Sequence, residues 1–425
     1  MTADKAPADK RHPTLEVLAN RDVRFFVASR YFSAASQTLL RTTIAWHVFE
    51  ITGSAFWLGF IGIVQFLPVL PMSLLAGAVA DAYDRRRVAL LAQGIALVCS
   101  TLLWLAASQG HVPIGLIFGI VFLVSIANAF ENPARSAILP TLVPRALFVN
   151  AVTLHATAQN LAWMSGPVLT GFLIDLYSLN AAYAVNAALL FVGLVLLAFV
   201  RAPASHEEKR RVTWAAIREG ISFVRHRSVI WSCMTLDLFA VIFAGATALL
   251  PIYANEILGV GARGYGILSA SLEMGTFLMA AILLIAPPIV RPGRALLYAV
   301  GVYGLATIVF GFSRWFPLSI AAFALAGMAD QVSMVSRSTI IQLSTPDALR
   351  GRVNSVNMIF INASNQLGIA ESGFLAAVTN AVFSVVAGGF ACLGVLGVVG
   401  AKVPALARYH VHDSDAEHAE SDAQP

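Results

Sequence analysis

Five ionisable side chains lie inside long apolar stretches of this sequence, where a charge is costly. They are Arg41, Asp237, Glu273, Asp330 and Glu371. In a lipid environment each charge costs on the order of several kcal/mol unless it is paired or reached by water. A carboxylate in such surroundings can alternate between its protonated and ionised forms. These residues are therefore candidates for coupling the entry of a proton to the exit of a solute.

The same residues could instead be structural. Asp237 and Asp330 each lie within about two helical turns of the end of their apolar stretch, where water or a neighbouring side chain could satisfy them. Arg41 could neutralise Glu371 or another acid. Both interpretations stay open at the level of sequence.

The elements that carry these residues must be membrane-spanning helices, because the composition does not suit a water-soluble chain. Of the 425 residues, 58% are hydrophobic and only 12% are charged, and the mean hydropathy is +0.75. Soluble proteins have about 25% charged residues. So few charges cannot cover a surface that faces water, and the apolar faces must contact lipid.

We predict twelve transmembrane helices, and hence an all-α membrane protein. A helix of about 20 mainly apolar residues crosses a hydrocarbon core of roughly 30 Å. Stretches of this kind lie at residues 24–49, 56–79, 88–108, 113–131, 150–175, 180–200, 229–252, 264–286, 295–313, 316–336, 354–378 and 380–402.

The basic residues orient this topology. Of the 28 Lys and Arg residues, 24 fall on one side of the predicted topology. The other four are Arg30, Arg41, Arg263 and Arg314. Because positive residues stay on the cytoplasmic side, both termini are expected in the cytoplasm. The net charge of +5 is thus a topology signal, and we expect no nucleic-acid partner.

The chain divides into two halves of similar size. Residues 23–201 and 229–402 each hold six predicted spans, and the polar residues 202–228 join them as a cytoplasmic linker. Within the linker, one helical face carries Trp214, Ile217, Ile221 and Val224, which predicts a short amphipathic helix at the membrane surface. Residues 1–22 form a cytoplasmic segment, and residues 403–425 a disordered cytoplasmic tail.

A faint repeat relates the two halves. At a fixed offset of 202 residues, the segment after the fourth span matches the segment after the tenth. The coincident residues include Arg135 with Arg337 and Pro144 with Pro346, and both segments are expected to be loops. Parallel repeats of six helices with a substrate cavity between them near mid-membrane are one known plan of transporters. The sequence therefore predicts two pseudo-symmetric six-helix bundles.

The turn between the second and third spans carries charges of both signs. Gly77 permits close approach of helices, Asp81 ends the second span, and Arg85 and Arg86 hold the turn in the cytoplasm. An acid and a cation cluster at this position could form a latch between helices that breaks when the halves move. Alternatively, the arginines only orient the chain.

This turn resembles the loop signature of the major facilitator superfamily, Gly-x-x-x-Asp-x-x-Gly-Arg-Arg. Asp84 stands where the signature has its second Gly, a position that usually has a positive φ angle, which Asp tolerates better than most residues. The whole chain is similar to the drug:proton antiporter branch, which includes the enterobactin exporter and macrolide efflux proteins. The segments that support this lie at residues 29–33, 132–135 and 345–354.

The resemblance assigns roles to several residues. It implies the major facilitator fold, with Glu131 at the end of the fourth span completing the latch of Asp81 with Arg85 or Arg86. It also implies that the first, fourth, seventh and tenth spans surround the cavity. Among the intramembrane charges this placement favours Arg41, Asp237 and Asp330.

The fifth span contains Gly166, Pro167 and Gly171. This pattern resembles the Gly-Pro-x-x-Gly-Gly element that marks exporters of the superfamily, although Thr170 replaces one Gly. A Gly-Pro pair bends a helix and leaves a smooth face for close packing. The element therefore favours export, and packing alone is the other interpretation.

The sequence contains no phosphate-binding loop, no metal-spaced cluster of His and Cys, and no nucleophile elbow. We expect no enzymatic activity, no cofactor and no metal, and a monomer is the working expectation.

The chain is predicted to be a multi-pass protein of a bacterial inner membrane. It would export amphipathic small molecules, such as drugs or siderophores, by alternating access driven by proton influx. A metabolite importer or facilitator on the same fold is one alternative, and a non-transporting sensor or scaffold is another.

Overall fold

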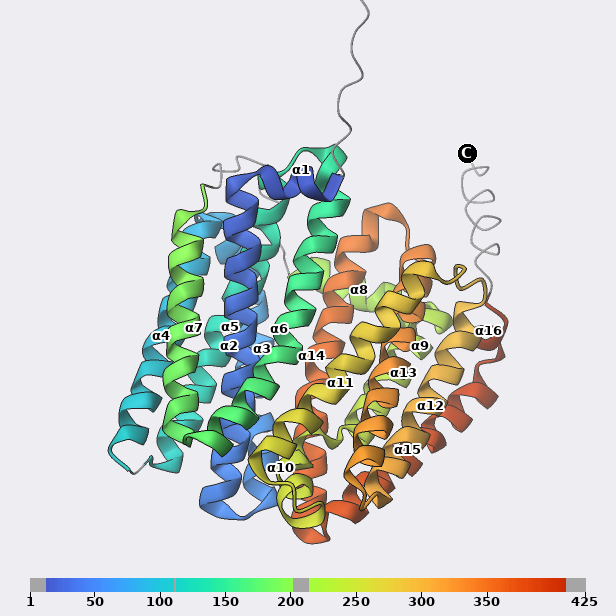
Figure 1. Ribbon diagram of the computed structural model, residues 1–425. Coiled ribbons are helices and arrows are strands. Elements are labelled where there is room, and N and C mark those ends of the chain that lie inside the picture. The colour runs from blue at the N-terminus through green and yellow to red at the C-terminus, as the bar shows by residue number, and fades with distance from the viewer. Residues whose placement is uncertain (1–12, 111, 202–213, 410–425) are drawn as a thin grey trace, which may run out of the picture.

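The computed structural model describes residues 13–110, 112–201 and 214–409 (Figure 1). Within these ranges the side chains of residues 13–15, 69–70, 73–74, 76–78, 80–82, 214–218, 220 and 347–348 lie outside the description. The architecture of the described part is helical throughout.

Twelve long helical segments make up the described part of the chain. They are α2 (Arg21–Thr52), α3 (Ala55–Ala82), α4 (Arg85–Ser108), α5 (Ile114–Leu142), α6 (Phe148–Leu176), α7 (Leu179–Phe199), α9 (Ser228–Ala244) with its continuation through α10 (Leu250–Ile252) and a π-helical turn (Tyr253–Ile257), α11 (Gly261–Ile285), α12 (Pro292–Phe312), α13 (Phe316–Leu343), α14 (Asp347–Val378) and α15 (Ala381–Lys402). Even the 21-residue helices are about 31 Å long at 1.5 Å per residue, so all twelve can cross a membrane.

Three short helices lie outside these spans. They are α1 (Pro13–Ala19), α8 (Trp214–His226) and α16 (Pro404–Arg408). The predicted linker helix is present as α8. Of the residues on its predicted apolar face, Val224 is buried and Ile221 is exposed, while the side chains of Trp214 and Ile217 lie outside the described residues.

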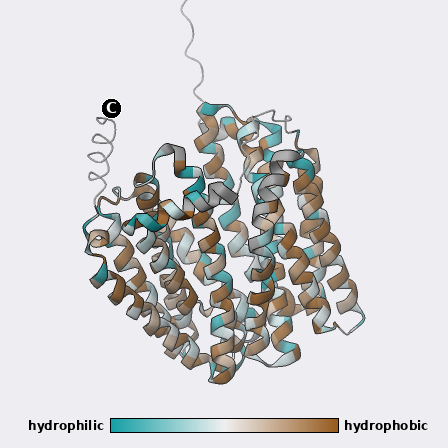
Figure 2. Cartoon of the chain, turned by 180° about the vertical axis from the view of Figure 1, so that it is seen from behind, coloured by the Kyte–Doolittle hydropathy of each residue, from teal (hydrophilic) through white to brown (hydrophobic). Residues whose placement is uncertain are grey.

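The surface of the helices is apolar over most of its length, as lipid requires. Figure 2 shows hydrophobic residues along the helices and hydrophilic ones concentrated toward their ends. Large side chains such as Tyr298, Leu284 and Val378 are mostly exposed. Eight of the twelve helices are apolar enough to be recognised as spans from length and composition alone. The predicted twelve-helix membrane fold is confirmed.

Three predicted spans are too short at one end; the eleventh was expected to begin at residue 354, but α14 begins at Asp347. The fourth was expected to stop at residue 131 and the tenth at residue 336, but α5 continues to Leu142 and α13 to Leu343. Arg135 and Arg337 were therefore wrongly assigned to loops, since both lie buried inside helices. The helix α5 runs through Pro133 and Pro140, which membrane helices tolerate because neighbours satisfy the freed backbone groups.

The helices pack as two groups. In the first, α2 packs against α6 and α7, and α4 packs against α5 and α7; in the second, α12 packs against α13 and α15, and α9 packs against α14 and α15. The groups meet through α3 with α14 and through α6 with α11 (Figure 1). We call them the first bundle and the second bundle.

The repeat is visible in the backbone. Pro144 follows α5 with φ −59° and ψ 151°, and Pro346 follows α13 with φ −57° and ψ 146°. These two residues are 202 positions apart and have the same extended backbone, although a 3₁₀ turn (Arg145–Leu147) follows Pro144 and α14 follows Pro346 directly. The local geometry agrees with a duplicated six-helix unit.

The two ends of the molecule are packed differently. We call the end that carries α1 the α1 face and the end that carries α10 the α10 face (Figure 1). The largest buried apolar cluster joins both bundles near the α10 face and includes Phe49, Leu58, Tyr253 and Tyr265. The clusters nearer the α1 face each belong to one bundle. The buried core that the bundles share is thus at the α10 face.

Glycines bring the backbones of the two bundles together there. A Cβ on Gly373 of α14 would lie 2.3 Å from Gly59 Cα of α3, and a Cβ on Gly266 of α11 would lie 2.8 Å from Gly171 Cα of α6. Any side chain at these positions would force the helices apart. Close packing of the two bundles at the α10 face therefore depends on glycines at these positions.

We expect Gly373→Ala to destabilise this packing, because the added methyl group overlaps the backbone of Gly59. Overpacking of this kind costs about 1–3 kcal/mol, and thermal unfolding of the purified protein should begin at a lower temperature. The matched control is Gly119→Ala, where a Cβ meets nothing within 4 Å. Equal melting temperatures of the two variants would show that the glycine contact does not hold the bundles together.

Candidate functional site

A buried ion pair lies in the first bundle, within α5. Arg135 Nε is 2.6 Å from Glu131 Oε1, and both residues are at most 2% exposed. Their spacing of four residues places them on the same helix face. Arg135 Nη2 also donates hydrogen bonds to Ser29 Oγ (3.2 Å), Ser33 Oγ (2.9 Å) and Gln93 Oε1 (2.8 Å). This arginine thus connects α5 to α2 and α4.

A second guanidinium lies close by on α2. Arg30 donates through Nε and Nη2 to Gln159 Oε1 of α6, at 3.2 and 3.0 Å. It is only 8% exposed, and it interacts electrostatically with both Arg135 and Glu131. Sequence reasoning did not single out Arg30 or Arg135 as site residues; the acid and arginine four residues apart on α5 were the available signal.

The second bundle has a buried ion pair of its own, between Arg337 of α13 and Asp237 of α9. Both residues are buried. Arg337 occupies the position in its bundle that Arg135 occupies in the first. Its acid comes from the first helix of the bundle, whereas Glu131 lies on the same helix as its arginine. The two bundles therefore have an arginine at equivalent positions, but the carboxylates that pair with these arginines come from different helices.

Two of the predicted proton-coupling residues, Asp237 and Asp330, border one small void together with Tyr303 and Ser333. Its volume is about 10 Å³, which is near the lower limit for one water molecule. A water held there would have two carboxylates and two hydroxyl groups as partners. Polar side chains of α9 and α13 therefore lie around the same void.

Glu273 continues this series toward the first bundle. It interacts electrostatically with Asp330 on one side and with Arg41 of α2 on the other. Glu273 is half-buried, and Arg41 is exposed near the middle of its helix. The structure therefore brings Arg41, Glu273, Asp330 and Asp237 into one series that begins at the boundary between the bundles.

Glu371 lies apart from this series. It is half-buried on α14 beside Ser372, seven residues before the helix ends at Val378. Among the described residues it shares none of the contacts that join the other three acids.

The charged turn between α3 and α4 differs from the expectation. Asp84 is the N-cap of α4 with φ −58°, so the expected positive φ angle is wrong; its carboxylate instead accepts from the backbone N–H groups of Arg86 and Arg87. Arg85 Nη1 donates to Ala137 O of α5 at 3.2 Å. The turn is held by capping and by hydrogen bonds to a helix carbonyl.

The predicted latch residues are only partly placed. Arg86 donates to the carbonyl oxygen of Ala198 at the end of α7. The partner of Glu131 is Arg135 rather than Arg85 or Arg86. Gly77 lies within α3, and the side chain of Asp81 lies outside the described residues.

The Gly-Pro element of α6 packs against two neighbours. A Cβ on Gly166 would lie 2.0 Å from Thr38 Oγ1 of α2, within the same bundle. A Cβ on Gly266 of α11, in the second bundle, would lie 2.5 Å from Pro167 O and 2.8 Å from Gly171 Cα. The smooth face predicted from the sequence thus serves one contact inside the first bundle and one between the bundles.

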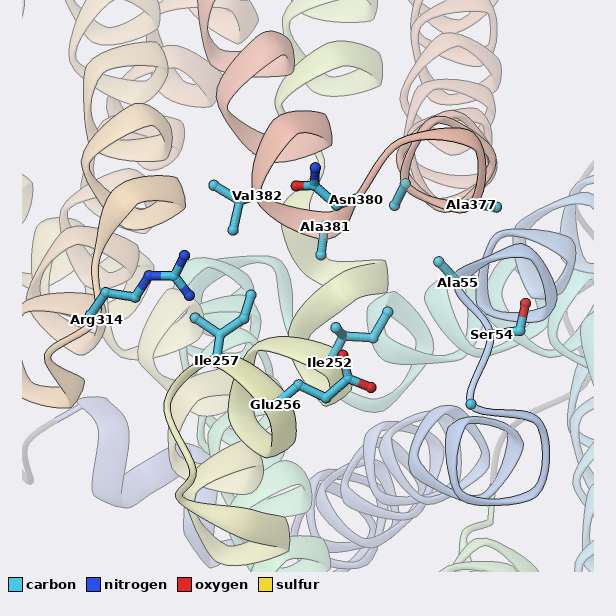
Figure 3. A pocket seen from close by; sticks show the side chains of 12 residues that line it. Ser54, Ala55, Ile252, Glu256, Ile257, Arg314, Ala377, Asn380, Ala381 and Val382 are labelled. Atoms are coloured by element: carbon cyan, nitrogen blue, oxygen red, sulfur yellow. The ribbon is translucent and has the colours of Figure 1, made fainter.

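A pocket of about 470 Å³ lies at the α10 face, where the bundles meet (Figure 3). Gly53 and Ser54 line it from the first bundle, and Asn380 from the second. Glu256 and Arg314 also border it and place opposite charges on its wall. The described residues contain no group of three His, Cys, Asp or Glu side chains that could hold a metal ion, and the three cysteines are buried and free.

Curated relatives of the chain are transport proteins. It is 25% identical to the enterobactin exporter EntS of Escherichia coli over 396 residues, which cover 92% of this chain and 91% of the relative. It is 22% identical to the staphyloferrin A transporter of Staphylococcus aureus over 79% of this chain and 85% of that protein. Macrolide efflux protein A of Streptococcus pyogenes is 23% identical, over 57% of this chain and 61% of its own length.

Solved structures of transporters share the fold. The nucleoside transporter NupG superposes with a TM-score of 0.72 at 14% identity, covering 92% of this chain and 100% of that one. A bacterial homologue of the human lysosomal transporter Spinster superposes with a TM-score of 0.69 at 15% identity, covering 95% and 99%. At these identities the likeness concerns the fold alone.

The family described as Transmembrane secretion effector matches residues 15–423, nearly the whole chain. With its twelve long helices and its relatives among transport proteins, the chain has the architecture of a multi-pass membrane transport protein. The chain belongs to the Transmembrane secretion effector family of the major facilitator superfamily.

Proposed function

We propose that this chain is a proton-coupled exporter of amphipathic small molecules, working by alternating access in a bacterial inner membrane with both termini in the cytoplasm. The observation that carries the proposal is the series of acids Glu273, Asp330 and Asp237, which leads from the boundary between the bundles into the second bundle. Such a series can accept protons on one side and release them on the other.

Export is supported by the relatives. Their names include an enterobactin exporter and a macrolide efflux protein, and we extend this direction of transport to the present chain. The Gly-Pro element of α6 agrees with it. Solutes of this kind combine polar groups with a large apolar body, and siderophores and macrolides are the classes to test first.

Alternating access is supported by the uneven packing of the two faces. With the α1 face in the cytoplasm, the bundles pack together on the outer side, so the arrangement is inward-open. The units that move would be residues 23–201 and 229–402, joined by the linker of residues 202–228. Opening to the outside would separate the glycine contacts of α3 with α14 and of α6 with α11.

The charged turn would act when the bundles close on the cytoplasmic side. We assign Asp81, Arg85 and Arg86 to a latch there, with Glu131 as a further member. In the inward-open arrangement Glu131 is paired with Arg135. Release of Glu131 from that pair, as α5 moves, would make its carboxylate available to the latch.

Transport in everted membrane vesicles tests the direction and the driving force. Vesicles that contain the protein should accumulate enterobactin, staphyloferrin A or a macrolide when a proton gradient is imposed, because the cytoplasmic face is then outside. A protonophore should abolish this accumulation. Uptake of these solutes by intact cells would instead indicate an importer, and accumulation that survives the protonophore would remove proton coupling.

Substitution of Asp330 tests the acid series. We expect Asp330→Asn to lower pH-driven efflux about tenfold or more, since the amide cannot bind and release a proton, while solute exchange without a pH gradient continues. Asp237→Asn is a poorer test because it leaves Arg337 buried without its carboxylate, which costs about 3–5 kcal/mol.

The control for this measurement is Asp175→Asn, which removes an exposed acid at the end of α6. Full pH-driven efflux in both Asp330→Asn and Glu273→Gln would show that protons travel elsewhere.

Substitution of Asp81 tests the latch. Asp81→Asn should slow turnover while membrane insertion and expression stay normal, because the latch needs the negative charge. Asp84→Asn is the matched control in the same turn, since Asn caps a helix about as well as Asp. If Asp81→Asn transports at the rate of Asp84→Asn, the latch is not part of the cycle.

A further inference from the structure

The first bundle holds more buried positive charge than buried negative charge. Among the described residues, its buried charged side chains are Arg30, Arg135 and Glu131. Those of the second bundle are Asp237 and Arg337, which balance each other. One guanidinium of the first bundle therefore has no carboxylate of its own.

The unbalanced guanidinium is that of Arg30. Glu131 is held by Arg135 at 2.6 Å and accepts a second hydrogen bond from Gln37 at 3.4 Å. Among the described residues, the only hydrogen-bond acceptor of Arg30 is the neutral Oε1 of Gln159, to which both Nε and Nη2 donate. Its Nη1 is buried and has no hydrogen-bond partner among the described residues. A buried guanidinium in this state is strongly destabilising unless an anion joins it.

The second arginine of the cluster points to the same need. Arg135 Nη1 is also buried without a hydrogen-bond partner in the described part of the chain, and Arg135 and Arg30 repel each other. Two adjacent guanidiniums with free N–H groups present the planar donors that bind a carboxylate through two hydrogen bonds. The cluster thus has the charge and the donors of an anion site.

The buried cluster is bordered by partly exposed side chains toward the α1 face. Arg30 lies nine residues from the start of α2, about 14 Å along the helix from the α1 face, on the side of the molecule where the bundles do not share a core. Gln159, Gln37 and Tyr31 beside it are only half-buried. Tyr31 and His155 are partly exposed aromatic side chains on the same two helices, and His155 is stacked on the buried Phe26. This setting suits an anionic head group attached to an apolar body.

We propose that Arg30 binds the anionic group of the transported solute, a carboxylate or another monoanion. Gln159 orients the guanidinium, and Arg135 adds positive potential from α5. This deepens the proposed function, on which it rests, by naming the solute class as amphipathic anions. The anion site lies in the first bundle and the proposed proton series in the second, so solute and protons are bound by different moving units.

Binding of a matched pair of probes tests the site without transport. The probes are dansyl-phenylalanine, which carries a free carboxylate, and its methyl ester, which is neutral and has the same apolar body. Binding to the purified full-length protein in detergent is followed by dansyl fluorescence. Wild-type protein should bind the carboxylate about tenfold or more tightly than the ester, as expected for a hydrogen-bonded charge pair.

Arg30→Gln should lose this preference and bind both probes equally. Arg30→Lys should keep part of it, because the charge remains and the planar fork is lost. Arg24→Gln removes an exposed positive charge from the same helix and should behave as wild type. Arg30→Gln should also unfold at the same temperature as wild type or higher, since an unbalanced buried charge is removed; this separates loss of the site from loss of the fold.

The outcomes distinguish this proposal from the proposed export. Wild-type protein that does not discriminate the carboxylate from the ester, whether it binds both or neither, overturns the anion site. So does a preference that survives in Arg30→Gln. Proton-driven efflux of the ester in vesicles would then still support an exporter. Conversely, a preference lost in Arg30→Gln without any efflux would keep the anion site and remove the export.

Discussion

A guanidinium inside a membrane protein requires a counter-charge, and this requirement shapes both bundles. Arg135 and Arg337 occupy equivalent positions in the repeat, and each is buried against a carboxylate. Because a lone buried charge is so costly, both arginines stay paired, and each ties the fourth helix of its bundle to the first: Arg337 through its ion pair with Asp237, and Arg135 through hydrogen bonds to Ser29 and Ser33. Arg30 lacks such a carboxylate in the described chain, and the same requirement makes it a place for an anionic solute.

The fold could be predicted from the sequence because lipid imposes a strong and simple pattern. Apolar runs of the right length marked all twelve spans, and the repeat around Pro144 and Pro346 marked the two bundles. The ends of α5 and α13 were missed, since a proline and an arginine normally indicate a loop. The ion pair that keeps Arg337 in its helix comes from α9, far away in the sequence, and no local pattern could reveal it.

The site was predicted less completely than the fold. Asp237, Glu273 and Asp330 stood out because acids are rare in apolar stretches, and Asp237 and Asp330 border one void. Glu371 met the same criterion but lies apart, and a role in proton coupling stays a prediction for all four. The sequence could not show which face of each helix points inward. In a membrane helix the lipid side and the core side are both apolar, so the amphipathic pattern that orients helices in water is weak.

The glycine contacts at the α10 face have a consequence for what can regulate the molecule. Contacts between backbones at Gly59 and Gly373, and at Gly171 and Gly266, rest on dispersion forces, which do not depend on protonation or ionic strength. The thickness and lateral pressure of the surrounding bilayer act directly on such a fit between helices. If the chain works by the proposed alternating access, a change in lipid composition should therefore alter how fast the α10 face opens, and leave the pH profile of that cycle unchanged.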